Sequence, residues 1–251
     1  MDLRPKHQLG YVLPVNVGDY IHYQFYRVAP QDCMLVCAPI GLQAFSSSGT
    51  EQALEKFWPA IEFLGGRGVQ RITQGGIPVS AHVGRQRMLA MIEEAERRTS
   101  ISCSADFEES IDALRELGVR KVAVAAKWNA ELMARVADYL REAGLDPVGV
   151  VAEPHTAQEV LAIQPDPGAD MAIALGRRAF RDHPSAEGLL LAGGSWLSLQ
   201  AVPALEAEFS RPVVTNPTAS YWAFLRQCGR AAQPGMGHLL GTLSEAPVRS
   251  P

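Results

Sequence analysis

Apolar and polar positions along the chain follow two alternating periodicities. Eight short apolar runs are bounded by glycine, proline or charged residues, which is the pattern of β-strands. The predicted strands are Leu9–Leu13, Met34–Ala38, Val69–Thr73, Ser100–Cys103, Lys121–Ala125, Val148–Val151, Gly188–Leu191 and Val213–Thr215. The segments between them repeat apolar residues three and four positions apart, which predicts amphipathic helices. The predicted helices are Glu51–Leu64, Ala81–Arg97, Ala105–Leu117, Ala130–Ala143, Asp170–Arg181, Ala204–Phe209 and Ala219–Gln227. Alternating strands and helices predict an α/β fold with parallel sheets.

The spacing of these elements also indicates an internal repeat. The segments Phe63–Gly76 and Glu116–Trp128 share the same order of helix end, glycine, basic residue and strand. We therefore expect two pseudo-symmetric domains, each a parallel β-sheet flanked by helices. The first domain is predicted to comprise residues 1–103 and 217–251, and the second residues 104–216.

Two segments carry little helical or strand pattern. Glu153–Gly168 contains three prolines, which remove backbone donors, so a loop is predicted there. The tail after Pro234 is expected to be irregular.

Two short runs read almost as copies of each other: Arg71–Gly76 (RITQGG) and Leu189–Trp196 (LLLAGGSW). Each is an apolar strand that stops at a pair of glycines and leads toward a helix. Such a turn lets backbone N–H groups face an anion, which the helix dipole also favours. Two such turns predict a ligand with two carboxylate-like ends, or with one carboxylate and one reacting oxygen.

The first turn contains Gly75, Gly76 and Ile77. Its N–H groups at Gly76 and Ile77 are candidates to bind a carboxylate or a developing oxyanion. A simple strand-to-helix turn is the alternative, because a lone Gly-Gly pair is weak evidence. The run is not a G-x-G-x-x-G motif, so a dinucleotide site is not supported.

The second turn, Gly193 and Gly194, adds the hydroxyl of Ser195. That hydroxyl is a candidate to bind a substrate carboxylate, or it satisfies local backbone groups. The run lacks the G-x-S-x-G pattern, which argues against a serine nucleophile. Trp196 is a candidate wall of an aromatic pocket, with ordinary packing as the alternative.

Polar residues also follow two other predicted strands. Lys127 and Trp128 lie at the carboxyl end of Lys121–Ala125, where open α/β sheets bind ligands. Lys127 is a candidate partner for a carboxylate, or a solvated lysine. Asn16, after the first strand, is a candidate anion donor or a residue that shapes a turn.

Composition narrows the range of partners. A formal net charge of −4 leaves no basic surface for nucleic acid, and no apolar run is long enough to span a bilayer. The first residues lack the apolar core of a signal peptide. The four cysteines form neither C-x-x-C spacing nor a disulfide framework, which favours a cytoplasmic protein. No His/Cys cluster indicates a metal.

The sequence resembles the aspartate/glutamate racemase superfamily, and within it the branch of arylmalonate decarboxylase and maleate cis-trans isomerase. The runs that carry the resemblance are LGYVLPVN (Leu9–Asn16), LRELGVRKVAVAA (Leu114–Ala126), LLLAGGSWLSLQAVPALEAEF (Leu189–Phe209) and PVVTNPTASYWAFLR (Pro212–Arg226). The resemblance covers nearly the whole chain. It implies two pseudo-symmetric halves, a closed pocket between them and no cofactor.

The resemblance also implies catalytic thiols that this chain lacks. Racemases of the superfamily carry a cysteine at the end of two equivalent strands, and decarboxylases of the branch keep the second one. In this sequence the two positions fall at Gly75 and Gly193, and the pocket tyrosine of the family is replaced by Trp128. Cys103, at a strand end, is the nearest substitute, although a small buried filler is the alternative.

Three functions remain open at this point. The first is a cofactor-free lyase that decarboxylates a small activated dicarboxylate, with Lys127 or Ser195 in a catalytic role. The second is an isomerase of the maleate or racemase type, which is weakened because thiol addition needs a cysteine. The third is a binding protein that keeps the dicarboxylate pocket without catalysis. A small carboxylate or dicarboxylate is the expected partner, and a homo-oligomer stays open.

Overall fold

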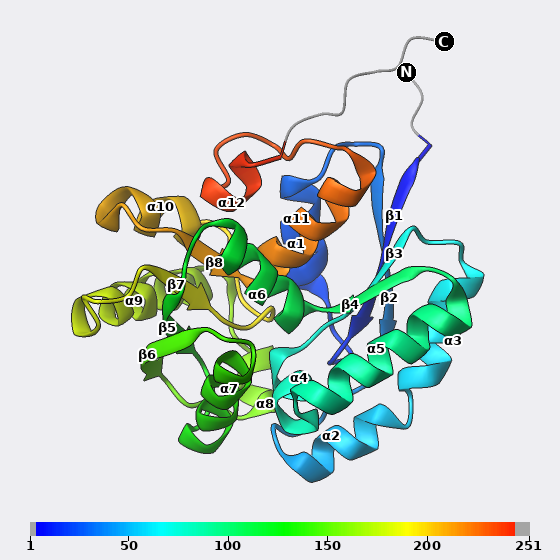
Figure 1. Cartoon of the computed structure of the whole chain (residues 1–251), viewed down its shortest axis with the longest axis horizontal. Coiled ribbons are helices and arrows are strands. Elements are labelled where there is room, and N and C mark those ends of the chain that lie inside the picture. The colour runs from blue at the N-terminus through cyan, green and yellow to red at the C-terminus, as the bar shows by residue number, and fades with distance from the viewer. Residues whose placement is uncertain (1–3, 244–251) are drawn as a thin grey trace.

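The computed structural model describes residues 4–243 of the chain. Within that range, eight strands form two four-stranded parallel sheets, in the orders β2-β1-β3-β4 and β6-β5-β7-β8 (Figure 1). The strands are β1 (His7–Leu13), β2 (Cys33–Pro39), β3 (Arg71–Gln74), β4 (Ser102–Ala105), β5 (Lys121–Ala126), β6 (Asp146–Ala152), β7 (Gly188–Leu191) and β8 (Val213–Thr215). The two sheets share one strand order, so β1 and β5 occupy the same place in each half.

Helices cover both sheets and fill the space between them. The described helices are α1 (Asp19–Val28), α2 (Ser47–Leu54), α3 (Phe57–Gly66), α4 (Ile77–Val83), α5 (Arg85–Thr99), α6 (Asp106–Glu116), α7 (Ala130–Glu142), α8 (Ala157–Leu161), α9 (Pro165–Asp182), α10 (Ala201–Phe209), α11 (Asn216–Cys228) and α12 (His238–Gly241). In Figure 1, α1, α6 and α11 lie between the sheets, and α6 contacts both β4 and β8. Helix α3 packs on the first sheet, and α9 packs on the second.

The largest hydrophobic core belongs to both halves. It contains Leu9 and Phe25 from the first half together with Val124 and Leu132 from the second, all less than 1% exposed. Each sheet also has one separate apolar cluster on its outer side. The cluster of the first sheet is centred on the α2–α3 region, and the cluster of the second lies beneath α9 and α10. Because the central cluster is shared, the two halves stabilise each other through apolar burial.

Each of the eight predicted strands overlaps an observed one, and the α/β fold with two parallel-sheet halves is confirmed. The first sheet extends through Ala105, and α11 contacts α1 and α6. Among residues 4–243, no helix combines the length and hydrophobicity that crossing a membrane requires.

Two predicted helices are each broken into two. Glu51–Leu64 divides into α2 and α3, because Pro59 in the first turn of α3 cannot donate to the carbonyl of Glu55. Ala81–Arg97 divides into α4 and α5 at Gly84, whose φ of 83° ends one helix before the other begins.

The predicted loop at Glu153–Gly168 and the predicted irregular tail were partly wrong. Helix α8 lies inside that loop, and α9 begins at Pro165 rather than at Asp170. Pro165 and Pro167 fall in the first turn of α9, where a missing N–H costs nothing. Helix α12 lies in the tail, whose residues 244–251 are outside the described range.

Helix α1 was not predicted because its sequence, DYIHYQFYRV, is rich in aromatic residues that do not favour helices. It forms because it buries one face: Ile21, Gln24, Phe25 and Val28 are spaced three, one and three apart.

Close packing of α9 on α10 predicts that alanine substitutions at two helical glycines change the stability of the protein in opposite directions. A Cβ atom at Gly176 would lie 2.3 Å from Cδ1 of the buried Leu205, whereas one at Gly66 would meet nothing within 4 Å. We expect Gly176→Ala to lower the free energy of unfolding by about 1–3 kcal/mol, as overpacked cores do. Gly66→Ala should raise it by about 0.4–1 kcal/mol, because alanine restricts the unfolded chain. Urea unfolding of both variants checks this, and equal effects would contradict the packing described.

Candidate functional site

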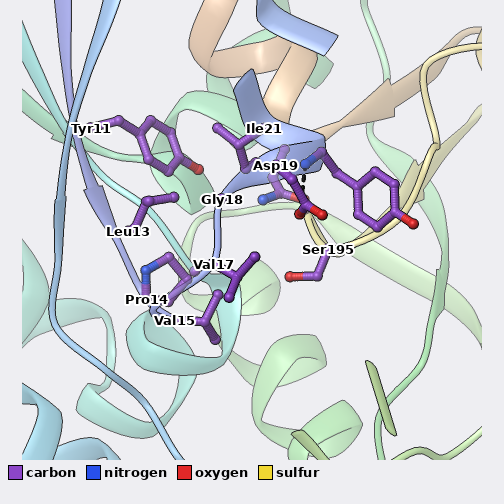
Figure 2. Close-up of a pocket in the computed structure, with 13 residues that line it drawn as sticks. Tyr11, Leu13, Pro14, Val15, Val17, Gly18, Asp19, Ile21 and Ser195 are labelled. Carbon is purple, nitrogen blue, oxygen red and sulfur yellow. Dashed lines mark hydrogen bonds between the residues drawn. The ribbon is translucent and has the colours of Figure 1, made fainter. Parts of the chain in front are cut away.

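A cleft lies where the carboxyl ends of the two sheets meet. It consists of two adjoining hollows that share Pro14, Val15, Gly76, Gly194, Ser195 and Asn216. The Lys127 hollow encloses about 440 Å³ of empty space and is also lined by Leu42, Phe45, Trp128 and Val160. The Tyr11 hollow encloses about 330 Å³ and contains Tyr11, Val17 and Asp19 (Figure 2).

Two polar side chains between the sheets hold the glycine turns together. Asp106, the first residue of α6, accepts hydrogen bonds at Oδ2 from the N–H of Gly76 at 2.7 Å and from Nδ2 of Asn216 at 2.7 Å. Asn216, the first residue of α11, accepts at Oδ1 from the N–H of Gly193 at 2.9 Å. The chain Gly76–Asp106–Asn216–Gly193 therefore joins the turn of one sheet to the turn of the other. We call it the turn bridge.

Asp106 is fully buried, and Tyr11 donates a further hydrogen bond to its Oδ2 at 3.2 Å. Its Oδ1 has no hydrogen-bond partner in the part of the chain that the structure describes. Burial raises the pKa of Asp106 to about 7, even though its hydrogen bonds act in the opposite direction. The carboxyl group therefore exchanges its proton near neutral pH.

The turn bridge reveals which residues correspond in the two halves. The N–H of Gly75 donates to β1 at 2.9 Å, and the N–H of Ala192 donates to β5 at 2.8 Å. The residues that follow, Gly76 and Gly193, have φ angles of 104° and 115° and both donate to the turn bridge. The structural counterpart of Gly193 is thus Gly76, not Gly75 as the sequence indicated.

Lys127 is the only lysine that lines the cleft. Its side chain is 0% exposed, and its Nζ has no hydrogen-bond partner within residues 4–243. A Cβ atom at Gly193 would lie 2.8 Å from that nitrogen, so the amine fills the space beside the second glycine turn. The alternative of a solvated lysine is therefore wrong.

Two effects act in opposite directions on the proton of Lys127. Its Nζ lies 3.3 Å from the centroid of the Trp196 ring, and this contact favours the ammonium by about 2 kcal/mol when water is absent. Removing an ammonium from water costs more, on the order of several kcal/mol. Burial consequently holds the pKa of Lys127 well below its usual value.

The backbone donors of the two turns divide into occupied and available groups. The N–H groups of Gly75, Gly76 and Gly193 are occupied by Val12, Asp106 and Asn216. Those of Ile77, Gly194 and Ser195 have no acceptor among the described residues. The N–H groups available to an anion are therefore those of Ile77 in the first turn and of Gly194 and Ser195 in the second. The N–H of Gly76, which the sequence suggested as a donor, is already occupied.

Ser195 lines both hollows, and its hydroxyl makes no hydrogen bond within residues 4–243. Figure 2 shows this hydroxyl directed toward the side chains of Val15 and Val17. The hydroxyl is thus available to a ligand rather than used by the local backbone.

The structure brings seven of the ten predicted site residues into the cleft lining: Gly76, Ile77, Lys127, Trp128, Gly193, Gly194 and Ser195. It does not bring in the other three. Asn16 is exposed, and its carboxamide lies beside Gly41. A Cβ atom at Gly75 would lie 2.2 Å from the Tyr11 ring, so Gly75 faces packed protein. Trp196 is fully buried behind Lys127, and its indole N–H donates to the carbonyl of Gly193 at 2.7 Å.

Cys103 does not line the cleft either. It packs in the outer cluster of the first half, and burial raises the pKa of its thiol to about 11. All four cysteines are free and none is among the lining residues. Within residues 4–243, no three His, Cys, Asp or Glu side chains are grouped as a metal ion would need.

Several residues of the site were not predicted. Asp106 and Asn216 each follow a strand directly. That position at a strand end was the one feature of the sequence that could have marked them as site residues. The apolar wall formed by Leu42, Phe45 and Val160 comes from loops and from the short helix α8, where the sequence has no distinctive pattern.

A side chain of the first half also fixes the loop after Gly194. Gln24 on α1 is 1% exposed, and its Oε1 accepts from the N–H groups of Ser198 at 2.9 Å and Leu199 at 2.8 Å. Its Nε2 donates to the carbonyl of Trp196 at 3.2 Å. The second turn therefore depends on both halves.

Two like parallel-sheet halves, each with a glycine turn at one shared cleft, define a pseudo-symmetric, two-domain α/β protein. A family model described as arylmalonate decarboxylase matches residues 14–240. The chain therefore belongs to the arylmalonate decarboxylase family.

Individual relatives agree with this assignment. Arylmalonate decarboxylase of Bordetella bronchiseptica is 28% identical over 234 residues, which cover 92% of this chain and 95% of that protein. The crystal structure of a double mutant of arylmalonate decarboxylase in its liganded form superimposes with a TM-score of 0.86 at 27% identity, over 93% of this chain and 98% of that one. Maleate cis-trans isomerase of Nocardia farcinica, with a covalently bound succinylcysteine intermediate, shares the fold, with a TM-score of 0.84 at 19% identity over 95% and 99% of the two chains.

The raised pKa of Asp106 predicts how stability changes with pH. Between its unfolded value near 3.8 and its folded value of about 7, the folded state holds a proton that the unfolded state has lost. The free energy of unfolding should therefore fall as pH rises through this window, by at most about 1.4 kcal/mol per unit, and level off above pH 7.

Asp106→Asn should remove this slope, because a carboxamide oxygen can accept the same three hydrogen bonds. Asp112→Asn, on the exposed face of the same helix, should leave it intact. Melting temperatures of the three proteins from pH 4 to 8 test the prediction. An unchanged slope in Asp106→Asn would mean that another group titrates.

Proposed function

We propose that the protein decarboxylates a small, activated dicarboxylate of the malonate type without a cofactor. The observation that carries the proposal is the amine of Lys127, which lies beside a glycine turn whose N–H groups at Gly194 and Ser195 are free. Membership of the arylmalonate decarboxylase family supports the same reaction class.

The cleft offers different surroundings to two carboxylates. The free N–H groups of Ile77, Gly194 and Ser195 would hold the carboxylate that stays, and the Ser195 hydroxyl would add a donor. The apolar side chains of Leu42 and Val160 would face the carboxylate that leaves. A charged group gains little there, whereas neutral carbon dioxide is accommodated, so carbon–carbon cleavage is favoured.

Cleavage leaves an enediolate, whose negative charge the same N–H groups would stabilise. The remaining step is protonation of carbon. Binding of a dianion beside the amine raises the proton affinity of Lys127, so the amine takes up a proton with the substrate. The resulting ammonium then donates this proton to the carbanion carbon and returns to the neutral amine.

The turn bridge would position these donors rather than act on substrate. With Gly76 and Gly193 held by Asp106 and Asn216, the following N–H groups are directed into the cleft. A thiol mechanism has less support, because burial raises the pKa of Cys33 and Cys37 to about 12 and neither lines the cleft.

Turnover of phenylmalonate tests the proposal. We expect the protein to release carbon dioxide, and Lys127→Met to slow release by about 10²–10⁴-fold, the usual contribution of a positioned acid. Methionine matches the shape of lysine and leaves no unpaired amine in the core, so the variant should fold. Lys121→Met, at the exposed end of the same strand, is the matched control and should keep full activity.

Two other outcomes would contradict the proposed decarboxylase activity. Conversion of maleate to fumarate without release of carbon dioxide would indicate the isomerase. Stabilisation by phenylmalonate in a thermal melt, without any product, would indicate a binding protein.

Proton uptake by Lys127 gives an independent prediction. Binding of malonate, which lacks an activating aryl group, should take protons from the buffer at neutral pH, because the bound anion raises the pKa of the buried amine. Calorimetric titrations in buffers of different ionisation enthalpy measure this uptake. It should vanish in Lys127→Met and persist in Lys121→Met; equal uptake in all three proteins would exclude Lys127 as the group.

A further inference from the structure

The amine of Lys127 has a second chemical capacity that proton donation does not use. It is fully buried, it has no hydrogen-bond partner, and no carboxylate lies against it among the described residues. Most buried lysines are paired with an acid. An unpaired amine that lines a ligand cleft is a nucleophile as well as a base.

We infer that Lys127 forms an imine with small 3-oxo carboxylic acids and that the protein decarboxylates them through this adduct. The inference uses the same cleft as the proposed function, but a different substrate class and a covalent bond to Nζ.

Each step of this reaction balances. The nitrogen of Lys127 adds to the ketone carbon, and loss of one water with uptake of one proton gives an iminium ion. The bond to the carboxylate carbon then breaks, its electron pair passes into the iminium, and carbon dioxide leaves a neutral enamine. A proton from solvent adds to the enamine carbon, and water releases the ketone, one proton and the free amine.

The surroundings of Nζ suit the first and third steps. The Nζ atom lies beside Gly193, whose successors Gly194 and Ser195 have free N–H groups that can bind the ketone oxygen as it gains charge. The Trp196 ring, 3.3 Å from Nζ, stabilises the cationic iminium as it would an ammonium. Leu42 and Phe45 supply the apolar wall in which a carboxylate is readily lost.

The chain contains only three other lysines, Lys6, Lys56 and Lys121, which serve as internal controls. The protein is incubated with acetoacetate and cyanoborohydride at neutral pH, and the labelled residues are mapped by mass spectrometry. We expect an isopropyl group on Lys127, since carbon dioxide is lost before reduction. Labelling at Lys127 should be about tenfold faster than at Lys121, because the buried amine lines the cleft that would hold the acid and burial lowers its pKa, which favours the neutral, nucleophilic form.

An arm with acetone, at the concentration that acetoacetate forms spontaneously, corrects for direct condensation with the product. Lys127-specific labelling above this arm, together with acetone formation that Lys127→Met abolishes and Lys121→Met preserves, supports the inference. No label at Lys127, equal labels on all lysines, or a label that retains the carboxylate would overturn it.

Phenylmalonate turnover measured on the same samples separates the two proposals. Turnover of phenylmalonate without trapping of acetoacetate would overturn the imine and leave the proposed function standing. Trapping of acetoacetate on Lys127 without turnover of phenylmalonate would support the imine and contradict the proposed function.

Discussion

The site depends on one buried hydrogen-bonded chain, in which Asp106 and Asn216 connect Gly76 with Gly193. These two side chains begin α6 and α11, so the helices that fill the space between the sheets also fix both turns. A buried carboxyl group is costly, and it is tolerated here because three donors converge on its Oδ2. With the first N–H of each turn occupied in this way, only the next ones remain for a ligand.

Lys127 places an amine beside Gly193, whereas the glycines at the strand ends have no side chain. A side chain at Gly193 would meet the Lys127 amine, and a φ of 115° would strain any residue with a Cβ. In the proposed function, the reactive group of this cleft therefore directly follows β5 and does not come from the turn after β7. An amine in place of a thiol would change the chemistry, because an amine can deliver a proton and can also condense with a carbonyl.

Much of the fold could be predicted from periodicity, because parallel strands buried on both faces leave clear apolar runs such as Lys121–Ala126 and Gly188–Leu191. The glycine pairs indicated the cleft, because a turn with positive φ needs glycine. Periodicity could not predict α1, whose aromatic residues are helical only because the shared core buries them. Nor could it show that Asn16 is exposed while Asn216 is central, because both follow a strand and only tertiary packing distinguishes them.

Gln24 has a consequence for how a ligand enters. Its carboxamide fastens the segment after Gly194 to a helix of the opposite half through hydrogen bonds to Trp196, Ser198 and Leu199. A hinge motion that swung the halves apart would break all of these bonds and divide the shared core. The Gln24 hydrogen bonds therefore oppose a hinge motion, and they do not hold the part of the cleft wall that comes from Leu42, Phe45 and the short helix α8.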